Sequence, residues 1–191
     1  MNDQILPNGA VSQLAAEHEV IQKVVAGLAA LRERLGGGSA MDVALLRRTV
    51  QFFREYADGL HHAKEEALLF PALERRGVPA RGCPVGALLA EHTRGRGLVS
   101  EFAERIEAYT SGADRAAADL AATMKVLAEL YPAHIWKEDY LLFPMTDKVL
   151  GEDDLVELAA KFSALNRASG EAALARAEAL ALEMSAIISQ S

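Results

Sequence analysis

The stretch HHAKEEALLFP at residues 61–71 recurs with few changes as HIWKEDYLLFP at residues 134–144. A shorter stretch precedes each copy, LAAEH at residues 14–18 and LLAEH at residues 88–92. The chain up to residue 150 therefore consists of two copies of one unit, which we expect to be a helical hairpin. Four of the five histidines fall at equivalent positions in the two copies.

Around these stretches the composition is typical of helices. Ala, Leu, Glu and Arg dominate, whereas aromatic residues make up only 6%. Residues that break helices are grouped at residues 36–39, 77–84, 111–112 and 151. The segments between them predict helices over about residues 10–35, 41–76, 84–110, 113–150 and 152–189. Pro71 and Pro144 fall late in two of these helices, and we expect each proline to kink or end its helix locally.

Short connections between long helices make sequential neighbours antiparallel. The sequence therefore predicts an all-α fold, namely an up-and-down antiparallel four-helix bundle with an additional C-terminal helix. The bundle is expected over residues 1–150. Residues 151–191 carry a broad apolar stripe, which predicts an amphipathic helix packed on the bundle or at a subunit interface. A homodimer through this C-terminal helix is one possibility.

Composition and charge exclude several classes of protein. The chain has 191 residues, 51% of them hydrophobic, which is enough for one substantial core. Its net charge of −7, without a basic block, argues against nucleic acid and anionic membranes as partners. The single cysteine, Cys83, excludes an internal disulfide and cysteine-rich metal sites. Neither an export signal nor a membrane-spanning run is apparent, so we expect a cytoplasmic protein.

The equivalent histidines are expected to meet at one level of the bundle. Residues four apart share a helix face, so His61 and His134 are each paired with a carboxylate one turn later. In each copy the two histidines also stand about equally far from the turn that joins their helices. Burying so many ionisable groups without a partner costs several kcal/mol each, and a bound cation removes that cost. The predicted metal ligands are His18, His61, Glu65, His92, His134 and Glu138.

Nitrogen and carboxylate donors suit iron, manganese or zinc. Six ligands exceed what one tetrahedral zinc ion needs, so two metals bridged by Glu65 and Glu138 fit better. Helical angles place Glu65 between His61 and His62, which makes His62 a further ligand or, equally, a residue at the rim of the bundle. Asp139 is a less favoured alternative ligand.

Other residues near the pattern have two interpretations each. Tyr131 lies on the face of His134 and either hydrogen-bonds to a ligand or packs in the core. Glu17 and Glu91 precede histidines and either accept hydrogen bonds from the site or are solvated charges, the commoner case. The larger aromatic residues are expected to pack in the core around the centre: Phe52, Phe53, Phe70, Phe102, Phe143 and Trp136.

The duplicated H…HxxxE pattern resembles the hemerythrin-like family, also called the HHE cation-binding domain. The resemblance covers about residues 10–150, and the repeated LLFP endings strengthen it. It implies a four-helix bundle with two non-haem iron ions, bridged by the two glutamates and by an oxo or hydroxo group. By position it implies the six ligands given above. In some relatives the residue directly after the second-helix histidine also binds metal, which implies His62 as well.

The resemblance implies a protein that binds dioxygen or a related small ligand. The purpose would be sensing of oxygen, iron or redox state, or else delivery or storage. Oxygen carriers of the family have a further histidine where this chain has Arg96, which leaves iron here more accessible to peroxide, nitric oxide or solvent. The alternative is therefore a di-iron enzyme that decomposes peroxide or reduces nitric oxide. A third possibility is a metal-free helical interaction module.

Overall fold

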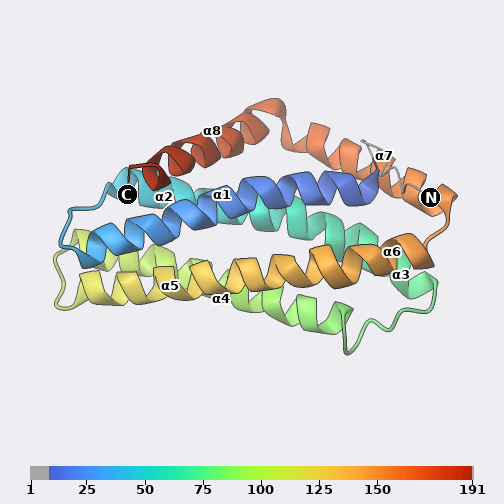
Figure 1. Cartoon of the computed structure of the whole chain (residues 1–191), viewed down its shortest axis with the longest axis horizontal. Coiled ribbons are helices and arrows are strands. Elements are labelled where there is room, and N and C mark those ends of the chain that lie inside the picture. Colours follow the sequence, from blue (N-terminus) through green and yellow to red (C-terminus); the bar gives the residue numbers. More distant parts are fainter. Residues whose placement is uncertain (1–8, 191) are drawn as a thin grey trace.

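The computed structural model describes residues 9–190 and shows helices running along one long axis (Figure 1). No strand occurs in this range. No helix among the described residues is both long and apolar enough to cross a membrane. The helical composition thus translates into an all-helical bundle, as the sequence predicts.

The first repeat (residues 14–76) forms one helix followed by a longer composite helix. Gly38, with a φ of 84°, lies in the connection between them, and the side chain of Asp42 caps the second helix by accepting from the Leu45 amide. That composite helix changes between α and π geometry along its length. The elements are α1 (Ala10–Gly36), α2 (Val43–Phe52), η1 (Phe53–His62), η2 (Glu65–Leu69) and α3 (Phe70–Arg75).

The second repeat (residues 88–150) also forms one helix followed by a composite helix, which has one π-helical stretch where the first repeat has two. Its second helix begins three residues later than the predicted residue 113, because Arg115 adopts a left-handed conformation with a φ of 60° just before it. Figure 1 shows the two helices of this repeat lying along each other. The elements are α4 (Val85–Thr110), α5 (Ala116–Lys137), η3 (Glu138–Leu142) and α6 (Phe143–Val149).

The two matched prolines do not end their helices. Pro71 and Pro144 each occupy the second position of a short α-helix, α3 or α6, which directly follows a π-helical turn. A proline inside an α-helix lacks the amide hydrogen and clashes with the carbonyl four residues earlier. The wider π turn, with its bonds five residues apart, accommodates this locally, so the helix continues.

The C-terminal segment is two helices rather than the single predicted one. Gly170, with a φ of 82°, separates α7 (Glu152–Ser169) from α8 (Glu171–Ile188). This backbone conformation favours glycine, so the break is local to that residue. Figure 1 shows the bend between the two helices as they lie over α1.

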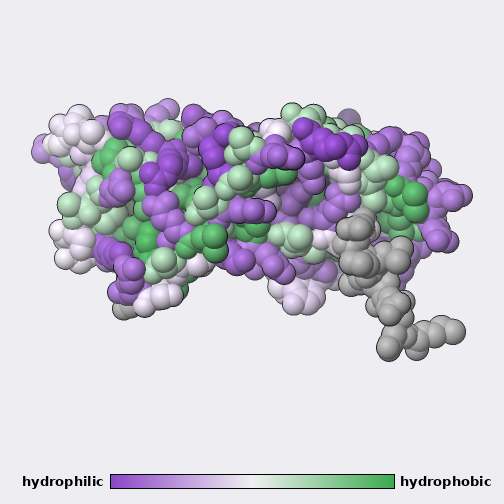
Figure 2. Space-filling view, turned by 90° about the horizontal axis from the view of Figure 1, so that it is seen from above, coloured by the Kyte–Doolittle hydropathy of each residue, from purple (hydrophilic) through white to green (hydrophobic). Residues whose placement is uncertain are grey.

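Close packing fixes α8 on α1. A Cβ atom placed on Gly27 of α1 would lie 2.4 Å from the Met184 Cβ atom of α8, so only glycine permits this approach. Met184 and Leu180 are buried in the contact. The opposite face of α7 and α8 is mostly hydrophilic, with apolar residues in scattered groups (Figure 2).

Two apolar clusters fill the bundle, and the histidines lie between them. The larger cluster contains Phe53 and Phe102 and extends to α8, whereas the smaller one contains Phe70, Phe143 and Phe162 of α7. The phenylalanines are thus core residues, as predicted. Trp136 is not: it is 54% exposed and stacks on Tyr140, because the inward face of this helix is taken by the histidine and glutamate of the repeat.

Candidate metal centre

Four histidine rings meet between the two apolar clusters. His18 on α1 and His61 on η1 lie with 3.1 Å between their Nε2 atoms. His92 on α4 and His134 on α5 form the equivalent pair, also with 3.1 Å between the Nε2 atoms. All four rings are buried. The predicted common level is therefore present, and four Nε2 atoms face the centre as two pairs.

Glu138 lies between the two pairs. Its Oε2 atom is 3.1 Å from His18 Nε2, whereas its Oε1 atom is 3.0 Å from His134 Nε2 and 3.6 Å from His92 Nε2. One carboxylate thus offers one oxygen to each histidine pair. A ligand that bridges two metal ions needs this placement.

Glu65 also faces both pairs. Its Oε2 atom lies 3.4 Å from His92 Nε2 and 3.9 Å from His61 Nε2. The predicted neighbour His61 is therefore in contact with Glu65, and His92 of the other repeat lies closer still.

The residues fit bound metal ions. All four carboxylate oxygens of Glu65 and Glu138 are buried, and their close contacts are with the histidine nitrogens given above, none of which meets the geometry of a hydrogen bond among the described residues. Buried carboxylate oxygens without partners cost several kcal/mol, whereas a cation would satisfy them together with the histidine nitrogens. Two groups of donor atoms that include these glutamates are close enough to share an ion: His18 with His61 and Glu138, and Glu65 with His92, His134 and Glu138.

In each pair, the second histidine along the chain donates from Nδ1 to a glutamate. This glutamate directly precedes the first histidine of the same pair. Nδ1 of His61 donates to Glu17 and Nδ1 of His134 donates to Glu91, both over 3.0 Å. A lysine of the same repeat contacts each glutamate, so Glu17 and Glu91 accept bonds from the site rather than standing free in solvent. The equivalent triads are His61–Glu17–Lys64 and His134–Glu91–Lys137.

The remaining two histidines bond to carboxylates across the repeats. Nδ1 of His18 donates to Asp139 over 2.7 Å, and Nδ1 of His92 donates to Glu66 over 2.8 Å. Asp139, the alternative ligand of the sequence analysis, therefore lies on the outer side of a histidine. Carboxylates in this position fix the ring and leave Nε2 as the metal-binding nitrogen. Glu66 was missed, although its equivalence to Asp139 in the repeat is a signal that could have found it.

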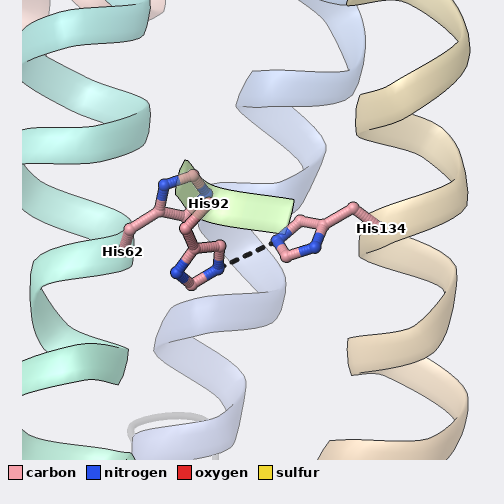
Figure 3. Close-up of side chains that lie close together, drawn as sticks. All are labelled: His62, His92 and His134. Atoms are coloured by element: carbon pink, nitrogen blue, oxygen red, sulfur yellow. Dashed lines mark hydrogen bonds between the residues drawn. The ribbon is translucent and has the colours of Figure 1, made fainter. Parts of the chain in front are cut away.

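His62 breaks the symmetry of the centre. Its ring stacks on His92 with 3.8 Å between ring centroids, and its donor nitrogen is close enough to those of His92 and His134 to share an ion with them. Figure 3 shows the three rings pointing toward one another from separate helices. His62 Nδ1 donates to Asp58 over 3.2 Å, which leaves Nε2 as its free nitrogen. Its equivalent in the second repeat is Ile135, so the two histidine pairs have unequal surroundings.

Tyr131 belongs to the packing around the site. Its ring is buried and stacks on Phe53, with 4.8 Å between the ring centroids. Burial raises the pKa of the Tyr131 hydroxyl above its ordinary value. This geometry favours the second of the two interpretations, that of a core residue.

Burial and close charges perturb the carboxylates and histidines of the centre. Burial, followed by repulsion from Glu138, raises the pKa of Glu65 well above its ordinary value. Burial acts in the same direction on Glu138, but the surrounding histidines outweigh it and lower the pKa of that carboxyl. For His18 burial is opposed by Asp139 and Glu138, which raise its pKa to about 9. Binding of a cation is therefore coupled to the release of protons.

Comparison with known proteins agrees with this geometry. The family model of the hemerythrin HHE cation-binding domain matches residues 9–146. The chain is 28% identical over 164 residues to the uncharacterized protein Rv1995 of Mycobacterium tuberculosis and to the uncharacterized protein Mb2018 of Mycobacterium bovis. These matches cover 84% of this chain but only 62% of each relative, so the chain spans less than two thirds of their length. Because the family model matches most of the chain, the protein belongs to the hemerythrin HHE cation-binding domain family.

Proposed function

We propose that this protein is a non-haem di-iron protein that binds dioxygen or a related small ligand, for sensing, delivery or storage. The observation that carries the proposal is the set of four buried carboxylate oxygens on Glu65 and Glu138, which lack hydrogen-bond partners and lie between two histidine pairs. A metal-free interaction module would leave this cost unexplained. We infer the histidines named above, including His62, and the two glutamates to be the ligands.

The proposed scaffold is an up-and-down four-helix bundle that ends at residue 150, with α7 and α8 as an addition to it. Iron, when bound, would supply a reversible redox couple and open coordination positions. The protein's own residues hold the ligand nitrogens in place through the outer carboxylates and exclude bulk water through the two apolar clusters. Zinc or manganese remains an alternative metal. A cytoplasmic location and a homodimer through the C-terminal helices remain predictions of the sequence.

The test is elemental analysis of protein produced in iron-replete medium, followed by anaerobic reduction and exposure to air. We expect about two iron ions per chain, as two bridged positions require. A stable visible absorption band that depends on oxygen would support binding of dioxygen. Glu65→Gln should lose iron, whereas Glu129→Gln, which alters only an exposed pair with Lys125, should not. Protein that contains no iron, or a Glu65→Gln variant with full iron content, would contradict the proposal.

An enzyme that decomposes peroxide or reduces nitric oxide is the second candidate. The position between His18 and His61 has two histidines nearby, whereas the other position has His62 as a third. The first position is therefore proposed to keep more coordination sites open to a substrate. Catalytic loss of peroxide or nitric oxide by the iron-loaded protein, without a stable oxygen-dependent band, would favour this candidate over the first.

A further inference from the structure

Arg96 joins two carboxylates at one side of the centre. It follows His92 by one turn of α4 and is 40% exposed. Its Nε atom donates to Asp58 Oδ1 over 2.8 Å, and a terminal nitrogen donates to Glu66 Oε1 over 2.6 Å. The planar guanidinium group suits this role, because its fixed donors can hold two acceptors at defined positions.

Each of these carboxylates also holds a histidine. Asp58 Oδ1 accepts from His62 Nδ1, and Glu66 Oε1 accepts from His92 Nδ1. The two rings are nearly parallel, with 12° between their planes. One guanidinium therefore orients two imidazoles, and a carboxylate on each Nδ1 keeps the opposite nitrogen available to a metal.

The arrangement has no counterpart on the other side of the centre. There, Asp139 accepts from His18, and no arginine among residues 9–190 forms an ion pair with this carboxylate. The equivalent positions of the other repeat carry Gln22 for Arg96, Tyr131 for Asp58 and Ile135 for His62. The two metal positions are therefore supported unequally, even though the inner glutamates and the four paired histidines are duplicated.

We propose that Arg96 is a positioning residue, which acts through Asp58 and Glu66 to make the position at His62, His92 and His134 bind metal more tightly than the position at His18 and His61. The two ions then load in sequence rather than together. This inference rests on the proposed function, since it requires that the centre hold two metal ions.

Charge alone predicts the opposite effect of Arg96. A guanidinium near a cation site repels the cation, so its removal would tighten binding if electrostatics decided the outcome. Positioning predicts weaker binding instead, because loss of a residue that orients ligands typically costs about 10- to 100-fold in metal affinity. The sign of the change therefore separates the two effects.

The experiment is a titration of the metal-free full chain with Co²⁺, followed by the visible absorption of the bound ion and by calorimetry. We expect two separate binding phases for the unmodified protein. Arg96→Met should weaken the tighter phase by about 10- to 100-fold and change the absorption band of that phase, while the weaker phase is unchanged. Gln22→Met is the matched control, since Gln22 is exposed at the equivalent position of the first repeat, and it should alter neither phase.

Other outcomes would overturn the inference. Unchanged or tighter binding by Arg96→Met would exclude positioning, and so would equal weakening by Gln22→Met. If Arg96→Met does not fold, as judged by far-UV circular dichroism, Asp58→Asn should weaken the same phase and provides the second test. If the unmodified protein binds no Co²⁺ at all, the proposed function fails as well, which distinguishes the two failures.

Discussion

The two repeats carry the same triads but differ in what covers them. In the first repeat Lys64 is 0% exposed, and its Nζ atom lies 5.8 Å from the centre of the Phe162 ring of α7. In the second repeat the equivalent Lys137 is 36% exposed. The duplication therefore accounts for the residues of the two triads. Their burial differs because α7, which lies outside the repeat, covers only the triad of the first repeat.

This difference should determine how much each triad contributes to stability. A charged group that is fully buried depends on its partner, because water cannot replace the lost interaction. A partly exposed pair, such as Lys137 with Glu91, is screened by water and contributes less. The His–Glu–Lys triad should therefore contribute strongly to stability in the first repeat and only weakly in the second.

The largest expected effect is that of Glu17→Gln. The substitution leaves Lys64 buried without a carboxylate, so we expect the free energy of unfolding to fall by about 3–5 kcal/mol. Glu91→Gln, the equivalent change in the second repeat, should cost about 1 kcal/mol or less. Urea denaturation of both metal-free variants measures the difference. Equal losses would show that the cover provided by α7 does not matter energetically.

The meeting of the paired histidines could be predicted, because the repeat places them at matching distances from the turns. His18 and His61 meet as expected, and so do His92 and His134. The buried state of Lys64 could not be predicted, because it depends on a helix about a hundred residues away along the chain.

Local backbone choices were the least predictable part of the fold. A proline such as Pro71 conflicts with α-helical geometry, but propensity alone does not distinguish a kink from a π turn. Ser169-Gly170 is the same dipeptide as the predicted break at residues 111–112, so the bend at Gly170 had a local signal that was outweighed by the good helix formers around it. The contacts of Arg96 were missed for a different reason: Asp58 and Glu66 lie on another helix, and the positions equivalent to Arg96 and Asp58 carry Gln22 and Tyr131.

The next effect concerns the two inner carboxylates. Glu65→Ala should weaken the binding of the ion at His92 and His134 by about 100-fold, or about 2.7 kcal/mol, because Glu65 lies within the donor group of that position alone; the helices should persist. Glu138→Ala should weaken both ions, because Glu138 lies 3.1 Å from a histidine of one pair and 3.0 Å from a histidine of the other. Metal titration with circular dichroism as the folding control measures both. Full affinity in either variant would remove that glutamate from the proposed ligand set.

A smaller effect is expected where α8 covers the first repeat. Gly27→Ala should destabilise the protein by about 2 kcal/mol, since the new methyl group collides with Met184 and displaces α8 from α1. Gly97→Ala on α4 is the control, because nothing lies within 4 Å of its Cβ position. That change should stabilise the helix by about 0.5–1 kcal/mol. Thermal denaturation reports both, and a neutral Gly27→Ala would mean that α8 shifts freely on α1.

The smallest effect is expected on the uncovered face of the second repeat. Trp136 occupies the position that Ala63 has in the first repeat, so Trp136→Ala makes the two repeats more alike. The side chain is more than half exposed and stacks only on the neighbouring Tyr140, and we expect a loss of about 1 kcal/mol or less. Metal content should not change, because the indole is exposed whereas His134 on the same helix is buried. If Trp136→Ala loses metal but keeps its melting temperature, the outer face of this helix contributes to the centre. The surroundings of the repeats would then affect metal binding as well as stability.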